Sequence, residues 1–162
     1  MSRSEADAVL VLARAAGVTL ATGESLTGGS LCAQLVDVPG ASESLCGGVV
    51  SYMVESKHDV LGVSQSLLDG PGPVSREVAQ AMATGARRAM GAAMGIATTG
   101  VAGPDPHGGQ APGTIWVAVD LEGTLTARQL HVDGDRGDVT RGAVSGALAL
   151  AREVLADRVA RS

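Results

Sequence analysis

The sequence almost lacks aromatic residues: its 162 residues include no Phe, one Trp and one Tyr. Apolar residues nevertheless make up 45% of the chain, which excludes a disordered protein. The core must therefore be built from Ala, Val, Leu, Ile and Met. The 23 glycines predict several places where the backbone approaches itself or a ligand closely.

Cysteine and histidine are also scarce. The two cysteines, Cys32 and Cys46, form no CxxC pair, and the three histidines lie far apart in the sequence. We therefore expect no structural metal and no cofactor. The chain has no apolar run of about 18 residues and no signal-peptide pattern, which predicts a cytoplasmic protein that does not contact a membrane and keeps its thiols reduced.

Positive charge is too sparse and too scattered to bind a nucleic-acid backbone. The net charge is −5, and the basic residues form no stripe along the sequence. A single phosphate group on a small-molecule nucleotide remains compatible with this composition, because one Arg and one helix N-terminus can hold it.

Helical and strand patterns alternate along the chain and predict one α/β domain over residues 1–162. Capping residues and apolar spacing indicate helices at 4–16, 30–36, 54–61, 64–68, 75–90 and 138–159. Strands are expected at 18–21, 45–53 and 95–99, and residues 114–121 and 124–132 flank Glu122-Gly123 as a β-hairpin. We predict a three-layer α/β/α sandwich with a mixed, mostly parallel sheet. A homodimer is compatible with so small a domain, although no pattern in the sequence requires one.

Two glycine-rich loops follow predicted strands directly, at residues 22–29 and 100–113. Ligands of α/β sheets bind where the strands end in loops. These loops are therefore the first candidates for a binding site, although a plain turn explains the segment from Gly100 through Gly103 to Asp105 nearly as well.

Lysine usage singles out one position. Eleven of the twelve basic residues are Arg, and Lys57 is the only Lys. Arg replaces Lys at most solvated positions, but it cannot act as a base because a guanidinium stays charged at any working pH. A surface lysine left by chance explains the composition equally well. A general base at Lys57 would need burial, since an unperturbed lysine is neutral in only about one molecule in 2,500 at pH 7.

Ser25 is the candidate nucleophile, because it lies in a glycine-rich turn between a strand and a helix. Backbone N–H groups from Leu26 to Gly29 could form an oxyanion hole, with Gly28 and Gly29 admitting a ligand to the backbone. A helix cap by Ser25 or Thr27 is the simpler explanation of the motif taken alone. No histidine lies in a recognisable triad setting, so Ser–Lys is the simplest pair of nucleophile and base.

Two further side chains are candidate site residues because of their positions in the sequence. Tyr52, the only Tyr, precedes Lys57 by five residues and could contact a ligand or pack in the core. Arg141 lies near the start of the last predicted helix, where a cation is disfavoured unless it serves an anion. It is our candidate for binding a phosphate.

Taken together, the motifs resemble the CinA C-terminal domain family, the nicotinamide-nucleotide amidohydrolases, in its stand-alone form. The matching segments run in family order over nearly the whole chain. They are Gly23–Gly29 (GESLTGG), Val38–Ser42 (VPGAS), Gly47–Tyr52 (GGVVSY), Lys57, Leu61–Val63 (LGV), Val74-Ser75, Thr99–Asp105 (TGVAGPD), Pro112–Thr114 (PGT) and Gly134–Arg136 (GDR).

This resemblance implies hydrolysis of the carboxamide of nicotinamide mononucleotide to nicotinate mononucleotide and ammonia, without a metal. It implies that Ser25 is the nucleophile and Lys57 its base. By position, Tyr52, Ser42, Thr99 and Arg141 would line the site.

The sequence departs from the family pattern at Leu26, where Cys is frequent, and in the loop Asp105–Ala111, which lacks a commonly seen Lys before Pro112. An amidase for a related amide therefore stays open. So does a non-catalytic module that binds a nucleotide or a protein partner.

Overall fold

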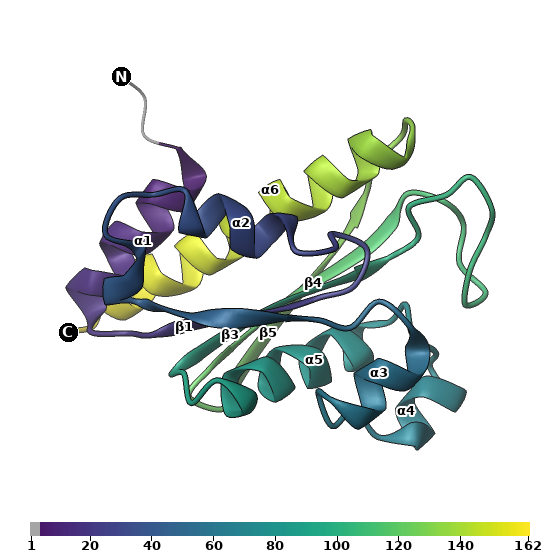
Figure 1. The fold of residues 1–162 in the computed structure, drawn as a ribbon, viewed down its shortest axis with the longest axis horizontal. Helices are drawn as coiled ribbons and strands as arrows, with labels where there is room; N and C mark the ends of the chain where they lie inside the picture. Colours follow the sequence, from purple (N-terminus) through teal and green to yellow (C-terminus); the bar gives the residue numbers. More distant parts are fainter. Residues whose placement is uncertain (1–3) are drawn as a thin grey trace.

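The computed structural model describes residues 4–162 and contains one five-stranded sheet between two layers of helices (Figure 1). The strands lie in the order β2-β1-β3-β4-β5. Their bounds are β1 (Leu20–Glu24), β2 (Leu45–Val50), β3 (Met94–Gly100), β4 (Thr114–Leu121) and β5 (Thr124–His131). Strand β1 is parallel to β2 and β3, whereas β4 is antiparallel to β3 and β5. The predicted three-layer fold with a mixed sheet is confirmed, but parallel pairing is limited to the β2-β1-β3 half.

The helices divide between the two faces of the sheet (Figure 1). One face carries α1 (Glu5–Ala16), α2 (Ser30–Val36) and α6 (Arg136–Ala160), and the other carries α3 (Val54–Asp59), α4 (Gln65–Asp69) and α5 (Arg76–Ala89). A 3₁₀ turn at Ala41–Glu43 was not predicted.

Local capping explains where the longer helices begin. The hydroxyl of Ser4 accepts from Asp7 N–H, and that of Ser75 accepts from Val78 N–H. Asp135 and Asp138 form a capping box at the start of α6, so this helix begins two residues earlier than its predicted range of 138–159.

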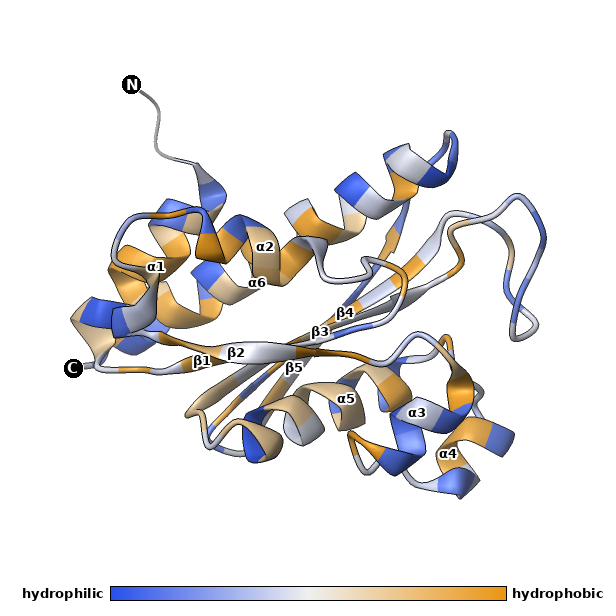
Figure 2. Ribbon diagram, viewed as in Figure 1, coloured by the Kyte–Doolittle hydropathy of each residue, from blue (hydrophilic) through white to orange (hydrophobic). Residues whose placement is uncertain are grey.

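The two faces of the sheet differ in the size of their side chains. Toward α1 and α6, the strands present Leu, Ile, Val and Met, including Ile96 of β3. Hydrophobic residues occur in the helices of both layers as well as in the strands (Figure 2). Toward α5 they present mainly Ala and Gly: Ala97 packs there, and a Cβ on Gly95 would overlap the backbone oxygen of Ala83. Helix α5 therefore lies very close to the sheet at Gly95, and the one aromatic side chain of this layer, Trp116 of β4, is partly buried beneath Arg76 at the start of α5.

The loop from β3 to β4 contains no crossover helix, which is why these strands pair antiparallel. Its middle is a tight hairpin in which His107 and Gln110 exchange two backbone hydrogen bonds. Gly108 and Gly109 have φ values of 56° and 76°, the left-handed conformation that a two-residue type I′ turn needs at both positions. Within residues 4–162, no helix combines the length and apolar character needed to cross a membrane.

Candidate active site

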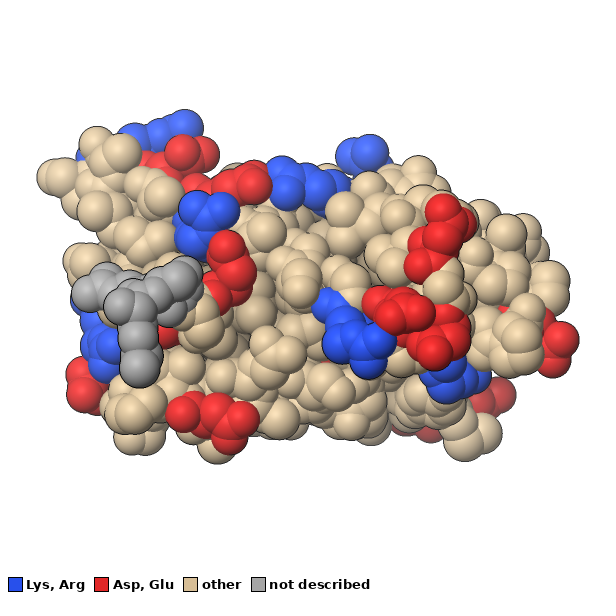
Figure 3. All heavy atoms as spheres, turned by 90° about the horizontal axis from the view of Figure 1, so that it is seen from above, with Lys and Arg blue, Asp and Glu red and all other residues tan. Residues whose placement is uncertain are grey.

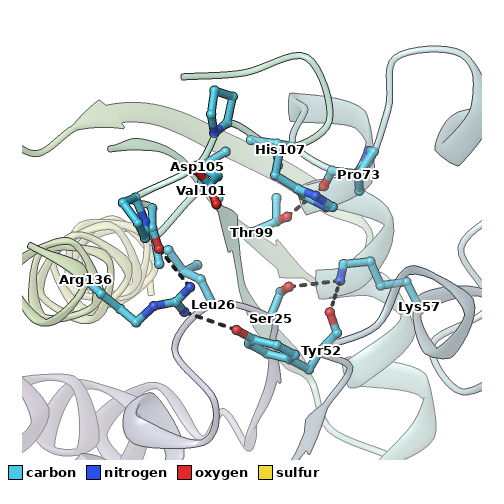
Figure 4. A pocket seen from close by; sticks show the side chains of 16 residues that line it. Ser25, Leu26, Tyr52, Lys57, Pro73, Thr99, Val101, Asp105, His107 and Arg136 are labelled. Carbon is cyan, nitrogen blue, oxygen red and sulfur yellow. Dashed lines mark hydrogen bonds between the residues drawn. The ribbon is translucent and has the colours of Figure 1, made fainter. Parts of the chain in front are cut away.

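A pocket of about 320 Å³ opens at the carboxyl ends of β1, β2 and β3 (Figure 4). This volume lies at the small end of the range of about 300–1,000 Å³ that is typical of small-molecule sites. Ser25 follows β1, Tyr52 follows β2, and Thr99 and Gly100 end β3. The parallel half of the sheet thus brings segments that are distant in the sequence to one edge, as expected for an α/β fold.

Ser25 and Lys57 contact one another in this pocket. The Nζ atom of Lys57 lies 2.9 Å from Oγ of Ser25, and both side chains are buried, with Lys57 only 2% exposed (Figure 4). The short helix α3 carries Lys57 back toward the end of β1. The two residues have the contact distance that a nucleophile and its general base require.

Two carbonyl oxygens fix the direction of the Lys57 amine. Nζ donates to the backbone oxygens of Ser51, at 2.8 Å, and Tyr52, at 3.3 Å. A carbonyl oxygen accepts hydrogen bonds but cannot donate them. When the amine is neutral, its two N–H groups can keep donating to these two carbonyls. Its lone pair then faces the third contact, the Ser25 hydroxyl, which is the only one of the three that can donate a proton.

Burial also increases the fraction of Lys57 whose amine is neutral. Removal from water lowers the pKa of Lys57 from 10.5 to about 8, although the Glu55 carboxylate opposes this effect. With a pKa of about 8, roughly one Lys57 in ten is neutral at pH 7. Lys57 therefore has the burial and the lowered pKa that a lysine needs to act as a general base.

The turn after Ser25 uses some of the N–H groups that were expected in an oxyanion hole. Gly28 N–H donates to the backbone oxygen of Ser25, and Gly29 N–H donates to the Glu24 carboxylate. Among residues 4–162, the N–H groups of Leu26 and Thr27 have no partner, and Leu26 lines the pocket. The expected set of donors is thus reduced to Leu26 and Thr27.

Arg136 contributes positive charge to the pocket. Its guanidinium donates to the phenolic oxygen of Tyr52 at 3.1 Å and to the backbone oxygen of Gly103 at 2.8 Å (Figure 4). Within the described chain, no carboxylate pairs with it. Arg141, by contrast, binds Asp138 on the exposed side of α6 and does not line the pocket.

The wall opposite Ser25 is formed by the β3–β4 loop and the segment before α5. The hydroxyl of Thr99 donates to the backbone oxygen of Pro73 at 2.7 Å and joins these two parts of the wall. Asp105 and His107 lie along the same wall (Figure 4). The loop that departs from the family pattern therefore borders the pocket directly.

The structure gathers part of the predicted set of site residues. The pocket is lined by Ser25, Tyr52, Lys57, Thr99, Gly100 and Gly103. It is not lined by Thr27, Gly28, Gly29, Ser42 and Arg141; Thr27 is buried behind Ser25, and Ser42 lies on the 3₁₀ turn near another surface. Arg136 lines the pocket but was not predicted to do so, because Arg141, near the start of the same helix, was chosen as the phosphate ligand. The Gly134-Asp135-Arg136 motif was the available signal.

Within residues 4–162, most arginines outside the pocket form ion pairs with carboxylates. On the face covered by α1, α2 and α6, positive and negative side chains are interspersed (Figure 3). Arg128 binds Glu153, Arg152 binds Glu5, and Arg158 binds Glu122. In the described part of the chain, no group of three His, Cys, Asp or Glu side chains is arranged to hold a metal ion, and both cysteines are free.

Fold and site together define a three-layer α/β domain with a buried serine–lysine pair at the carboxyl edge of its sheet. The sequence matches the family model of the CinA C-terminal domain over residues 2–155, and the chain belongs to this family.

Relatives and solved structures agree with this assignment. A CinA-like protein of Frankia casuarinae is 48% identical over 139 residues, covering 85% of this chain and 32% of the relative. A CinA-like protein of Mycolicibacterium gilvum is 43% identical over 150 residues, covering 90% of this chain and 35% of the relative. The chain thus spans about a third of the length of these curated relatives.

Two solved structures superpose on nearly the whole chain. A competence-damaged protein (CinA) superfamily protein from Klebsiella pneumoniae matches with a TM-score of 0.88 and 33% identity, covering 96% of this chain and 99% of that one. A competence or damage-inducible protein from Enterobacter asburiae matches with a TM-score of 0.90 and 30% identity, covering 95% and 99%.

Proposed function

We propose that this protein hydrolyses the carboxamide of nicotinamide mononucleotide to nicotinate mononucleotide and ammonia, with Ser25 as nucleophile and Lys57 as general base. The observation that carries the proposal is the 2.9 Å contact between Lys57 Nζ and Ser25 Oγ in a buried setting that lowers the lysine pKa. A surface lysine would have no such contact, and a binding module would have no need of a buried amine. The family resemblance supplies the substrate.

In the acylation step, neutral Lys57 accepts the Ser25 hydroxyl proton while Oγ attacks the carboxamide carbon. The carbonyl π electrons move to oxygen, and in this proposal the unpartnered N–H of Leu26 stabilises the resulting oxyanion. Collapse of the tetrahedral intermediate breaks the C–N bond, and Lys57 returns its proton to the nitrogen, which leaves as ammonia. An ester of Ser25 remains.

In the deacylation step, water attacks the ester and gives a proton to Lys57. The bond to Oγ breaks, Lys57 protonates Ser25, and the carboxylic acid product leaves. Throughout both steps, the carbonyls of Ser51 and Tyr52 hold the amine in place through its N–H groups.

Arg136 is suited to the phosphate of the substrate. It is the one guanidinium that lines the pocket, it has no carboxylate partner in residues 4–162, and Tyr52 and Gly103 already hold it in position. Arginine binds phosphate through two parallel hydrogen bonds, and its unused N–H groups can supply them. We therefore propose Arg136 in place of Arg141 for this contact.

The test is ammonia release from nicotinamide mononucleotide by purified protein in EDTA. We expect release by the wild type and none by Ser25→Ala or Lys57→Arg, with all three folded by circular dichroism. An active Lys57→Arg variant would contradict the role of the lysine.

If the folded wild type releases no ammonia, the same assay on a panel of carboxamides separates a different amide from a binding role. Turnover of another amide would keep the mechanism and replace the substrate. Binding of the nucleotide without turnover of any amide would remove the enzyme proposal.

A further inference from the structure

Glu24, the residue immediately before Ser25, is the most deeply buried acidic side chain at the site. It ends β1 and has no exposed surface. It does not line the pocket, and the reaction proposed above assigns it no step. A buried carboxylate is costly unless donors surround it, so the reason for its presence lies in its contacts.

Five donors converge on the Glu24 carboxylate. Oε1 accepts from Thr27 Oγ1 at 2.6 Å and from the N–H groups of Gly29 and Leu31 at 3.2 and 2.9 Å. Oε2 accepts from Thr22 Oγ1 at 3.2 Å and Cys32 N–H at 3.0 Å. These donors lie on both sides of Ser25, on β1, on the turn and on the first residues of α2.

The carboxylate replaces the missing cap of α2. The N-cap residue of this helix is Gly29, which has no side chain and makes no side-chain cap. Glu24 instead accepts the N–H groups at the start of α2 from outside the helix, where a negative charge is also favoured by the helix dipole.

A second chain of bonds joins the same turn to β3. Thr27 Oγ1 lies 2.8 Å from Thr98 Oγ1, and the backbone oxygen of Thr98 accepts from Ser25 N–H at 3.0 Å. Since the Thr27 hydroxyl has one proton, it donates to Glu24 and accepts from Thr98. Glu24, Thr27 and Thr98 thus form one buried polar network around the backbone of Ser25.

The backbone of Glu24 connects this network to the base. Its carbonyl oxygen accepts from Ser51 N–H at 2.8 Å, and the carbonyl oxygen of Ser51 accepts from Lys57 Nζ. Successive side chains of a strand point to opposite faces, so Glu24 contacts α2 while Ser25 contacts Lys57.

We infer that Glu24 is a positioning residue for the nucleophile: its carboxylate fixes the turn between β1 and α2 so that Ser25 Oγ stays in line with the Lys57 amine. This inference rests on the proposed nucleophilic role of Ser25 but does not depend on the natural substrate. A displacement of about 1 Å in a reacting group can reduce a rate on the order of 10²-fold.

The test uses Glu24→Gln, which keeps the shape of the side chain but places an NH₂ group against one of the N–H donors. Thr27→Val is a milder second variant that removes one donor to Glu24. The matched control is Asp120→Asn. Asp120 is another buried carboxylate, which accepts from Thr84 Oγ1 and Gly123 N–H far from the pocket, and its loss reports destabilisation alone.

The measurement is the second-order rate of Ser25 labelling by a small sulfonyl fluoride, together with kcat and KM for nicotinamide mononucleotide. We expect Glu24→Gln to label at full stoichiometry but on the order of 10²-fold more slowly, with a matching loss of kcat and little change in KM. The labelling rate and kcat of Thr27→Val should lie between those of Glu24→Gln and the wild type. Asp120→Asn should lower the unfolding temperature and leave the labelling rate unchanged.

Wild-type labelling rates in both Glu24→Gln and Thr27→Val would overturn the inference, as would an equal loss of rate in Asp120→Asn. If the wild type labels at Ser25 and depends on Glu24 but does not hydrolyse the mononucleotide, the positioning role stands and the substrate is wrong. If neither labelling nor hydrolysis involves Ser25, the inference and the proposed function fall together.

Discussion

The phenolic oxygen of Tyr52 accepts a hydrogen bond from Arg136 at 3.1 Å, joining the end of β2 to the start of α6 across 84 positions of sequence. The same tyrosine accepts from Lys57 through its backbone oxygen. One residue thus contacts both the base and the cation proposed to bind the substrate phosphate. The bond places Arg136 at the edge of the pocket rather than in solvent.

Replacement of Arg136 tests this placement. We expect Arg136→Gln to raise KM for nicotinamide mononucleotide about 10- to 100-fold, since a hydrogen bond to a charged group contributes about 1.5–3 kcal/mol. KM for the riboside, which lacks the phosphate, should change little. Arg141→Gln is the matched control on the same helix, because within residues 4–162 its guanidinium binds Asp138 alone, on the exposed side. Equal effects of the two variants on KM would contradict the assignment.

The pH dependence of the reaction follows from the neutral form of Lys57. Because burial lowers its pKa to about 8, kcat/KM should rise tenfold per pH unit below that value and level off above it. Initial rates of ammonia release across this range measure the profile. A rate that is independent of pH between 6 and 9 would argue against lysine as the base.

Replacement of Glu55 should shift the pH profile of kcat/KM. Its carboxylate raises the pKa of Lys57 against the effect of burial. Glu55→Gln should therefore shift the midpoint of the kcat/KM profile to lower pH, and high salt should reduce the difference from the wild type. Glu43→Gln, a change of the same charge on the 3₁₀ turn, serves as the control. A shift to higher pH in Glu55→Gln would contradict the electrostatic explanation.

The same pKa predicts how stability depends on pH. The native state loses the Lys57 proton near pH 8 and the unfolded chain near 10.5, so between these values the unfolded chain binds more protons. The free energy of unfolding therefore rises with pH in this window, by on the order of 3 kcal/mol in total. Lys57→Met should lack this contribution. Urea unfolding of both proteins from pH 8 to 10.5 measures the difference, and parallel curves would rule out a depressed lysine pKa.

The close packing of α5 predicts a steric effect away from the site. A Cβ on Gly95 would overlap the backbone oxygen of Ala83, so Gly95→Ala should destabilise the protein by about 1–3 kcal/mol. Gly137→Ala is the control, because its Cβ would meet only the end of the Arg141 side chain and the Asp135 cap at 3.1 and 3.2 Å. Equal unfolding temperatures for Gly95→Ala and the wild type would contradict the close packing.

Much of the fold follows from local signals in the sequence. Capping residues such as Ser75 and the turn at Glu122-Gly123 are local features, and the predicted helices and hairpin appear within a few residues of their expected bounds. The sheet was expected to be mostly parallel because helices alternate with strands. The missing helix between residues 100 and 114 was the sign that β4 returns antiparallel to β3.

The site was harder to predict because its details depend on backbone atoms that a sequence does not display. Arg136 and Arg141 both lie near the start of α6, and the sequence does not show which of the two guanidinium groups faces the pocket. Glu24 resembles an ordinary polar turn residue, since three of its five donors are backbone N–H groups brought together only by folding. Lys57 could be selected because it is the only lysine, and Ser25 because it lies in a glycine-rich turn directly after a predicted strand.

The preference for arginine has a practical consequence for chemical biology. Apart from the N-terminus, the whole chain contains a single primary amine, that of Lys57. An amine-directed probe small enough to enter the pocket would therefore attach its tag at the Ser25–Lys57 site without any engineering. Mass spectrometry of the tagged peptide would then count occupied pockets directly, in purified protein or in a mixture.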